Sequence, residues 1–235
     1  MIPISTNILQ RTFRIKYGES TGTCFTIDVS GRQYVVTARH VVKNMRPNDA
    51  IHIWHDNTWK KLNTTIAWIS KGEDDIAILN PKIQLSTTHP VIPSNDNLIL
   101  GQDVYFLGYP YGMTTEFNRK HSFPLVKKGI VSGFGNKESW PQFYIDGHNN
   151  PGFSGGPIVF HNLYSKSENP CIAGIISSYK TENKPLLKGS DNTGLVSAHN
   201  TGIIVAYGIQ NGVKYITENP SGFKLDASRY NHARN

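Results

Sequence analysis

Short runs of β-branched and aromatic residues, separated by turn residues, recur along most of this sequence and constrain its fold more than any other feature. Such residues favour the half-buried surface of a strand, and Gly, Pro and Asn between them favour turns. Helical periodicity is confined to Tyr207–Thr217, where apolar side chains recur on one face. The pattern predicts an all-β fold, with strands at Thr12–Tyr17, Thr23–Val29, Gln33–Thr37, Ala50–Trp54, Thr65–Ile69, Ile76–Leu79, Asp103–Leu107, Gly129–Phe134, Gln142–Asp146, Pro157–Phe160, Cys171–Ser177 and Gly202–Ala206.

About twelve short strands followed by one helix indicate two packed β-barrels with a short C-terminal helix. A break near Thr88–Asn97 places an N-terminal barrel at about residues 10–92 and a C-terminal barrel at about 97–218, within a single domain of residues 1–235. The polar, mixed segment Tyr111–Val126 is predicted to be a surface loop, and residues 219–235 a polar tail.

The formal net charge of +7 raises the question of an anionic partner. The basic residues are scattered, however, and the densest groups, Lys60-Lys61 and Lys127-Lys128, are too short to form a patch. We therefore predict no nucleic-acid binding. No apolar run is long enough to cross a membrane, and the N-terminus lacks the features of a signal peptide, so a cytoplasmic protein without a membrane partner is expected.

The two cysteines, Cys24 and Cys171, both lie in apolar, strand-like runs. A secreted fold that depended on disulfides would carry more of them. We interpret both as buried free thiols.

The strongest local signal is the segment Asn150-Pro151-Gly152-Phe153-Ser154-Gly155-Gly156-Pro157. A nucleophilic serine requires a sharp turn that exposes its hydroxyl and aims two backbone N–H groups at one point, where they bind the oxyanion of a tetrahedral intermediate. Glycines beside the serine permit such a turn. For this segment taken alone, a Gly-Ser turn between two strands is the alternative.

Two further segments each place one functional side chain at the end of an apolar run. His40 follows the run Tyr34–Ala38, and histidine is the usual general base because its two ring nitrogens have distinct roles. Asp75 opens the run Ile76–Leu79, and an acid there is placed to fix the tautomer of a nearby histidine. Asp74 is the competing candidate, because strand alternation directs one of the two acids towards the histidine and the other towards solvent.

Taken together, the three segments are more specific than any one of them. Their order along the chain, His40, Asp75 and Ser154, is one of the known orders of a catalytic triad. The first two would belong to the first barrel and the serine to the second, with the site in the cleft between them. No metal site is predicted, because His52 and His55 would point to opposite faces of a strand.

Several segments of the chain also follow the pattern of one known family. They are Gly22–Ile27, Val36–Val42, Asp75–Leu79, Leu107–Gly112, Gly129–Gly133, Asp146–Pro157, Gly174–Ser177 and Asn192–Ala206. Through them the chain resembles a trypsin-like, chymotrypsin-fold serine protease, and within that group the protease domain of the HtrA (Deg) proteins. The resemblance implies two six-stranded antiparallel β-barrels and hydrolysis of peptide bonds without a cofactor.

The resemblance also implies a role for each site residue. Ser154 would attack the peptide carbonyl while His40 takes its proton, and Asp75 would orient His40. The backbone N–H groups of Gly152 and Ser154 would form the oxyanion hole. The strand from Ser177 to Tyr179 would pair with the backbone of a protein or peptide substrate.

The sequence departs from the family pattern at several positions. Phe153 replaces the Asp that pairs with a new N-terminus in trypsin-like zymogens, so activation by N-terminal cleavage is not expected. Val41 replaces the cysteine of the disulfide beside the histidine in extracellular members, which agrees with a reducing compartment. The residues after Tyr207 are too few for the PDZ domain that HtrA proteins carry, so we expect none.

The specificity pocket is expected to be lined by five residues. His148 falls at the position of the acidic base of the trypsin pocket, so cleavage after Lys or Arg is not expected, and Tyr179 falls where digestive enzymes have Gly. The pattern predicts a small or polar residue before the scissile bond. The five lining residues are His148, Asn149, Ser177, Ser178 and Tyr179.

Two other functions are open for the same fold. The first is a pseudo-protease or binding scaffold, and the second is an esterase that uses the same triad. A stand-alone protease inside a cell must also be restrained. We therefore expect a narrow substrate range, or a resting enzyme whose oxyanion loop is opened by an activating protein partner, with Phe153 and the loop Tyr111–Val126 as candidates for that control.

Overall fold

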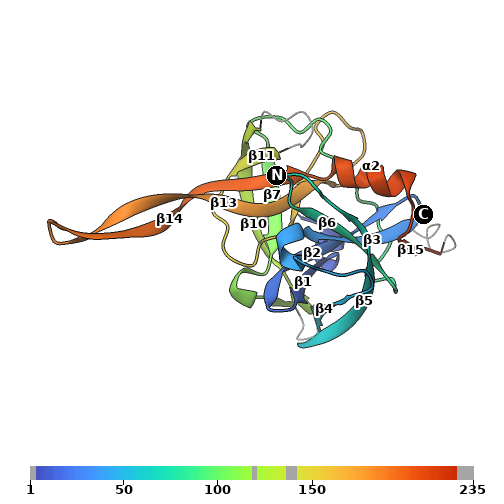
Figure 1. Ribbon diagram of the computed structural model, residues 1–235. Coiled ribbons are helices and arrows are strands. Elements are labelled where there is room, and N and C mark those ends of the chain that lie inside the picture. The colour runs from blue at the N-terminus through green and yellow to red at the C-terminus, as the bar shows by residue number, and fades with distance from the viewer. Residues whose placement is uncertain (1–3, 118–120, 136–141, 227–235) are drawn as a thin grey trace.

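The computed structural model describes residues 4–117, 121–135 and 142–226, and the expected all-β fold is confirmed (Figure 1). The first sheet has the strand order β15-β3-β2-β1-β4-β5-β6, and an additional β3–β6 pairing closes six of these strands into a ring. Its strands are β1 (Thr12–Tyr17), β2 (Ser20–Val29), β3 (Arg32–Ala38), β4 (Ala50–His55), β5 (Thr58–Ile69), β6 (Ile76–Pro81) and β15 (Phe223–Lys224).

The second sheet is a closed antiparallel barrel with the order β10-β11-β14-β13-β12-β7. Its strands are β7 (Asp103–Gly108), β10 (Leu125–Phe134), β11 (Gln142–Asp146), β12 (Pro157–Phe160), β13 (Cys171–Lys188) and β14 (Asp191–Gly208). Closure pairs every strand on both sides within the barrel, which leaves free edges only where a strand runs beyond it.

The expected C-terminal helix is present as α2 (Gln210–Glu218), and it packs on the first ring although it follows a strand of the second. Ile216 is fully buried, and Tyr215 lies 6.4 Å from the ring of Trp68. Other helical segments are α1 (Thr6–Gln10) and the 3-10 turns η1 (Arg39–Val42) and η2 (Pro110–Gly112). No helix in the described ranges has the length and apolar character needed to span a membrane.

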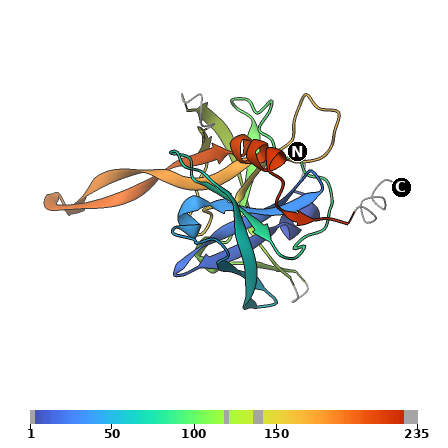
Figure 2. The same ribbon diagram turned by 45° about the vertical axis from the view of Figure 1, so that its right-hand side comes forward.

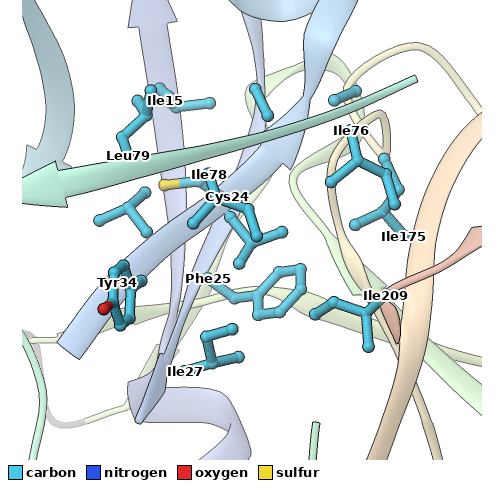
Figure 3. Packing of buried hydrophobic residues seen from close by; sticks show 14 of the residues in the cluster. Ile15, Cys24, Phe25, Ile27, Tyr34, Ile76, Ile78, Leu79, Ile175 and Ile209 are labelled. Carbon is cyan, nitrogen blue, oxygen red and sulfur yellow. The ribbon is translucent and has the colours of Figure 1, made fainter. Parts of the chain in front are cut away.

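The core of the first ring also contains side chains from the second half of the chain (Figure 3). Phe25 and Ile78 are fully buried there beside Ile175 of β13 and Ile209, which directly precedes α2. Cys24 belongs to the same cluster, and both Cys24 and Cys171 are buried free thiols, as expected. The shared cluster packs the two halves of the chain against each other.

Two parts of the chain differ from the sequence-based expectation. The segment Tyr111–Val126, expected to be a surface loop, contains the paired strands β8 (Thr115–Phe117) and β9 (His121–Phe123) and the start of β10, while residues 118–120 lie outside the described part. In the expected tail, β15 pairs with β3, and residues 227–235 lie outside the described part.

The larger difference is the length of β13 and β14, which continue far beyond the expected strands Cys171–Ser177 and Gly202–Ala206. Together they form a long twisted hairpin that extends away from both barrels in two views (Figures 1 and 2). The segment beyond Tyr179 is polar and carries Gly and Pro, so it lacks the apolar alternation from which a strand is predicted.

Candidate functional site

The strand register of the first ring brings His40 and Asp75 together. β3 and β6 are antiparallel neighbours, and Ala38 at the end of β3 lies opposite Ile76 at the start of β6. The residues just outside this pair are therefore forced into contact, although 35 positions separate them in the chain. The turn η1 then directs the His40 ring towards Asp75.

Three hydrogen bonds converge on the carboxylate of Asp75. The backbone N–H of His40 donates to Oδ1 at 2.9 Å, and His40 Nδ1 lies 2.6 Å from Oδ2. The hydroxyl of Ser177 donates to Oδ2 at 2.7 Å. Because the carboxylate is an acceptor, Nδ1 of His40 is the donor, and Nε2 is left free to accept a proton.

The electrostatics of Asp75 favour the ionised carboxylate. Burial alone would raise its pKa, but the hydrogen bonds and charge of His40 and the hydroxyl of Ser177 outweigh burial and hold the pKa below its ordinary value. The site therefore retains a negative charge that holds the His40 ring in place.

Asp74 does not face solvent, contrary to the expectation from strand alternation. Its exposed fraction is 3%, and its Oδ1 has no hydrogen-bond partner among the described residues. Burial raises the pKa of this carboxyl, with Ser70 and Arg39 acting in the opposite direction. Alternation fails here because Asp74 precedes β6 and lies in a loop, where the strand rule does not apply.

Ser154 lies in the loop before β12, beside the point where β13 leaves the barrel. Its hydroxyl donates to the carbonyl oxygen of Ser177 at 3.1 Å. No hydrogen bond in the described structure joins Ser154 to His40. Rotation about the Cα–Cβ bond of Ser154 can redirect its hydroxyl. Ser177 thus touches both Asp75 and Ser154, a link that the sequence did not indicate.

The backbone of the Ser154 loop is held in a defined shape. The N–H of Tyr111 donates to the carbonyl of Pro151 at 2.9 Å, so the N–H of Gly152, on the opposite side of that trans peptide, points away from it. Gly152 has φ +108°, which side chains rarely adopt. The N–H groups of Gly152 and Ser154 have no acceptor within the described residues, and both are available to a negatively charged oxygen.

Thr23 of β2 connects this loop to the first ring. Its hydroxyl donates to the carbonyl of Gly152 at 2.7 Å, and its backbone N–H donates to the carbonyl of Ser154 at 2.8 Å. The carbonyl of Thr23 in turn accepts the hydroxyl of Thr37 at 2.8 Å. The shape of the loop therefore depends on the contact between the two barrels.

Phe153 is fully buried, with its ring 5.3 Å from that of Phe106 in an edge-to-face arrangement. Its contact with Gly108 is so close that a methyl group there would overlap the ring. Phe153 therefore anchors the Ser154 loop in the core of the second barrel through apolar contact.

The five residues expected in the specificity pocket have different environments. Asn149 is buried with a side-chain oxygen that has no partner within the described residues, and Asn200 donates to its backbone carbonyl at 2.8 Å. His148 is exposed, and the Lys127 ammonium donates to its carbonyl. Ser177 is buried, Ser178 is exposed and Tyr179 is half-buried.

A Gly156→Ala substitution is expected to destabilise the protein by about 3 kcal/mol or more. A Cβ at this position would overlap the carbonyl oxygen of Leu107, which belongs to β7 and cannot move without distorting the barrel. Urea unfolding measures the change. Gly133→Ala is the matched control, because its Cβ would lie 3.3 Å from a movable side-chain atom of Tyr144. Similar stability of both variants would contradict the packing argument.

A Ser177→Ala substitution is expected to lower the free energy of unfolding by roughly 1–3 kcal/mol at pH 7, because ionised Asp75 loses a donor in a buried place. The pKa of Asp75 is depressed in the fold, so this contribution is present above the ordinary carboxyl value of 3.8 and is lost as the pH falls through the lower folded value. Urea unfolding of both proteins across this pH range measures it. A stability difference that grows towards acid pH would contradict the assignment.

The chain has detectable relatives among known families and structures. The trypsin-like peptidase domain family matches residues 22–162. The chain is similar to the HtrA-type protease AlgW, solved with a tripeptide, at 20% identity and a TM-score of 0.57, over 91% of this chain and 62% of the AlgW chain. It therefore spans less than two thirds of the AlgW chain.

Two other solved structures are similar to the chain. A serine endoprotease from Yersinia pestis is 21% identical with a TM-score of 0.56, over 93% of this chain and 67% of that chain. Deg5 is 19% identical with a TM-score of 0.57, over 90% of both chains. These similarities support the fold. No curated protein matches the sequence.

Proposed function

Because the chain belongs to the trypsin-like peptidase domain family, we propose that it is a serine endopeptidase that acts through Ser154, His40 and Asp75. The observation that carries this proposal is the Asp75 carboxylate, which binds the His40 ring at 2.6 Å and, through Ser177, reaches the hydroxyl of Ser154. A binding scaffold has no need of these contacts around one free ring nitrogen.

In the proposed reaction, the hydroxyl of Ser154 turns from Ser177 towards His40 and attacks the carbonyl carbon of the scissile peptide bond. Nε2 of His40 takes the hydroxyl proton and then gives it to the leaving amine, which leaves an acyl-enzyme that water hydrolyses. Asp75 fixes the ring and stabilises its positive charge. No cofactor is needed for these steps.

The N–H groups of Gly152 and Ser154 are proposed to bind the oxyanion that forms on the carbonyl oxygen. Their support is the fixed orientation of the Pro151–Gly152 peptide and the absence of a competing acceptor within the described residues. Donors that are already in place when charge develops are often the largest single contribution to catalysis.

The specificity proposal keeps a small or polar residue before the scissile bond. It is supported by the buried side-chain oxygen of Asn149, which has no partner among the described residues, and by the half-buried Tyr179 in the expected opposite wall. Cleavage profiling of a peptide library tests it, and a preference for large aromatic or basic residues would contradict it. Restraint by narrow specificity or by an activating partner is also proposed, and free digestion of unfolded casein would contradict that part.

Labelling with a fluorophosphonate probe tests the proposed nucleophile. The parent protein is expected to be labelled, whereas Ser154→Ala and His40→Ala proteins are not, because the probe reacts only with an activated serine. Circular dichroism confirms that each variant is folded. Equal labelling of the parent and Ser154→Ala would contradict the assignment, and hydrolysis of ester but not peptide substrates would favour the esterase alternative.

A further inference from the structure

Residues 180–201, which we call the arm, form the outer part of the β13–β14 hairpin and extend away from both barrels (Figures 1 and 2). The strands pair from Thr181 opposite Asn200 to Lys188 opposite Asp191, and none of the residues 178–203 is buried. A two-stranded ribbon with no face covered is marginally stable in water. The arm is thus an exposed element for which the fold itself gives no structural use.

The edge of β13 that faces away from β14, which we call the outer edge, leads directly from the proposed nucleophile to the arm. β12 pairs with β13 as far as Ile175, after which Ile176 bonds to Gly155 and Gly156 in the Ser154 loop. The next residue, Ser177, accepts the hydroxyl of Ser154. Beyond it, no described strand pairs with this edge. An unpaired strand edge offers N–H and C=O groups to an added strand.

The direction of an added strand is fixed by the position of the nucleophile. A substrate that runs antiparallel to β13, with its scissile carbonyl at Ser154, places the residues before the scissile bond along the arm. From Tyr179 to Lys188 the edge continues for roughly 30 Å at about 3.3 Å per residue. It therefore reaches about nine residues beyond the short edge from Ser177 to Tyr179.

The side chains of the arm favour a polypeptide substrate over a second copy of the chain. Apolar side chains gather in its outer half, where they are between 43% and 65% exposed: Leu186, Leu187, Leu195 and Val196. The β13 strand also carries Pro185 and the lysines Lys180, Lys184 and Lys188. Like charges on two paired copies of this edge would repel each other, whereas a substrate strand need not carry them.

We propose that the arm is a docking surface for the extended segment of a protein substrate that lies before the scissile bond. This segment adds as a strand to the outer edge of β13 and places apolar side chains against the apolar outer half of the arm. The proposal rests on the proposed function for the position of the scissile bond, although docking itself requires no catalysis.

Peptide selection on the inactive protein tests docking separately from cleavage. Random 16-residue peptides displayed on phage are selected on full-length Ser154→Ala protein. Their affinity is then measured for the same protein with Glu182–His199 replaced by Asn-Gly, a turn that joins the pair Thr181–Asn200. Selected peptides are expected to bind at least about tenfold more weakly to the shortened protein. Equal affinity for both proteins would overturn the proposal.

Point variants then locate the contact on the arm. Combined Leu187→Ser and Val196→Ser substitutions in the inactive protein are expected to weaken binding of the selected peptides by about fivefold or more, since both side chains are over 60% exposed. Leu163→Ser, at 68% exposure outside the arm, is the matched control and is expected to change nothing. Equal weakening by the control, or a dimer in sedimentation that becomes a monomer when the arm is shortened, would overturn the proposal.

Cleavage of the selected peptides separates the two proposals. The active parent is expected to cut them near the end opposite to the one that the arm binds, and removal of their first residues is expected to raise KM at least about tenfold with kcat little changed. Arm-dependent binding without cleavage would sustain docking and contradict the proposed function. Cleavage whose KM is independent of peptide length and of the arm would do the reverse.

Discussion

Replacement of Ser154 by alanine is expected to lower kcat for a cleavable peptide by about 10⁶-fold. The attacking oxygen is lost, and with it the acyl-enzyme route. The fold should survive, because the hydroxyl makes a single hydrogen bond to the carbonyl of Ser177, which is worth about 1 kcal/mol. Steady-state kinetics with the purified variant measure the loss, and thermal unfolding confirms that the protein is intact.

The matched control is Ser165→Ala, an exposed serine in the loop between β12 and β13. It is expected to keep the kcat of the parent. A Ser154→Ala protein that retained more than about a thousandth of the parent activity would show that another group is the nucleophile.

Replacement of Asp75 by asparagine is expected to lower kcat by about 10⁴-fold. The amide keeps the size of the carboxylate but has one acceptor oxygen, whereas the carboxylate accepts the His40 N–H, the His40 ring and the Ser177 hydroxyl. The His40 ring would lose the partner that holds Nδ1 protonated, so Nε2 would no longer be the base. Kinetics at pH 7 measure the loss.

Asp74→Asn is the control for Asp75→Asn, since it changes the adjacent acid in the same way. It is expected to keep kcat and to gain on the order of 1 kcal/mol in stability at pH 7, because burial disfavours the charged carboxyl. A carboxyl whose pKa is raised in the fold destabilises it at neutral pH, and the gain should vanish below about pH 4, where the unfolded chain is protonated too. An equal loss of kcat in both variants would contradict the choice of Asp75.

Much of the fold follows from local patterns, and the exceptions have physical causes. The barrel strands with alternating or continuous apolar residues, such as β6 and β11, are visible in the sequence because burial dictates their composition. The arm has no buried side chain, so nothing in its composition distinguishes it from a loop. β8 and β9 have three residues each, which is too few for an alternating pattern to be recognised.

The candidate site could also be predicted in part from the sequence, but for a different reason. His40, Asp75 and Ser154 belong to short motifs whose residue types the proposed chemistry requires, so the three segments together point to them as candidates. The hydrogen bond from Ser177 to Asp75 and the one from Thr23 to the Ser154 loop depend on which acceptor oxygen lies near which hydroxyl. Such contacts arise only when strands distant in the sequence are registered against one another, and no local pattern encodes them.

α2 and β15 follow the second barrel in the sequence but pack on the first. Before α2 docks, the hydrophobic surface around Ile78 and Trp68 that it covers is open, and the first half has no finished core. The Ser154 loop relies on Thr23 of that same half. The Ser154 loop is therefore expected to take its final shape only together with the docking of α2, since small domains fold cooperatively once their contacts are complete.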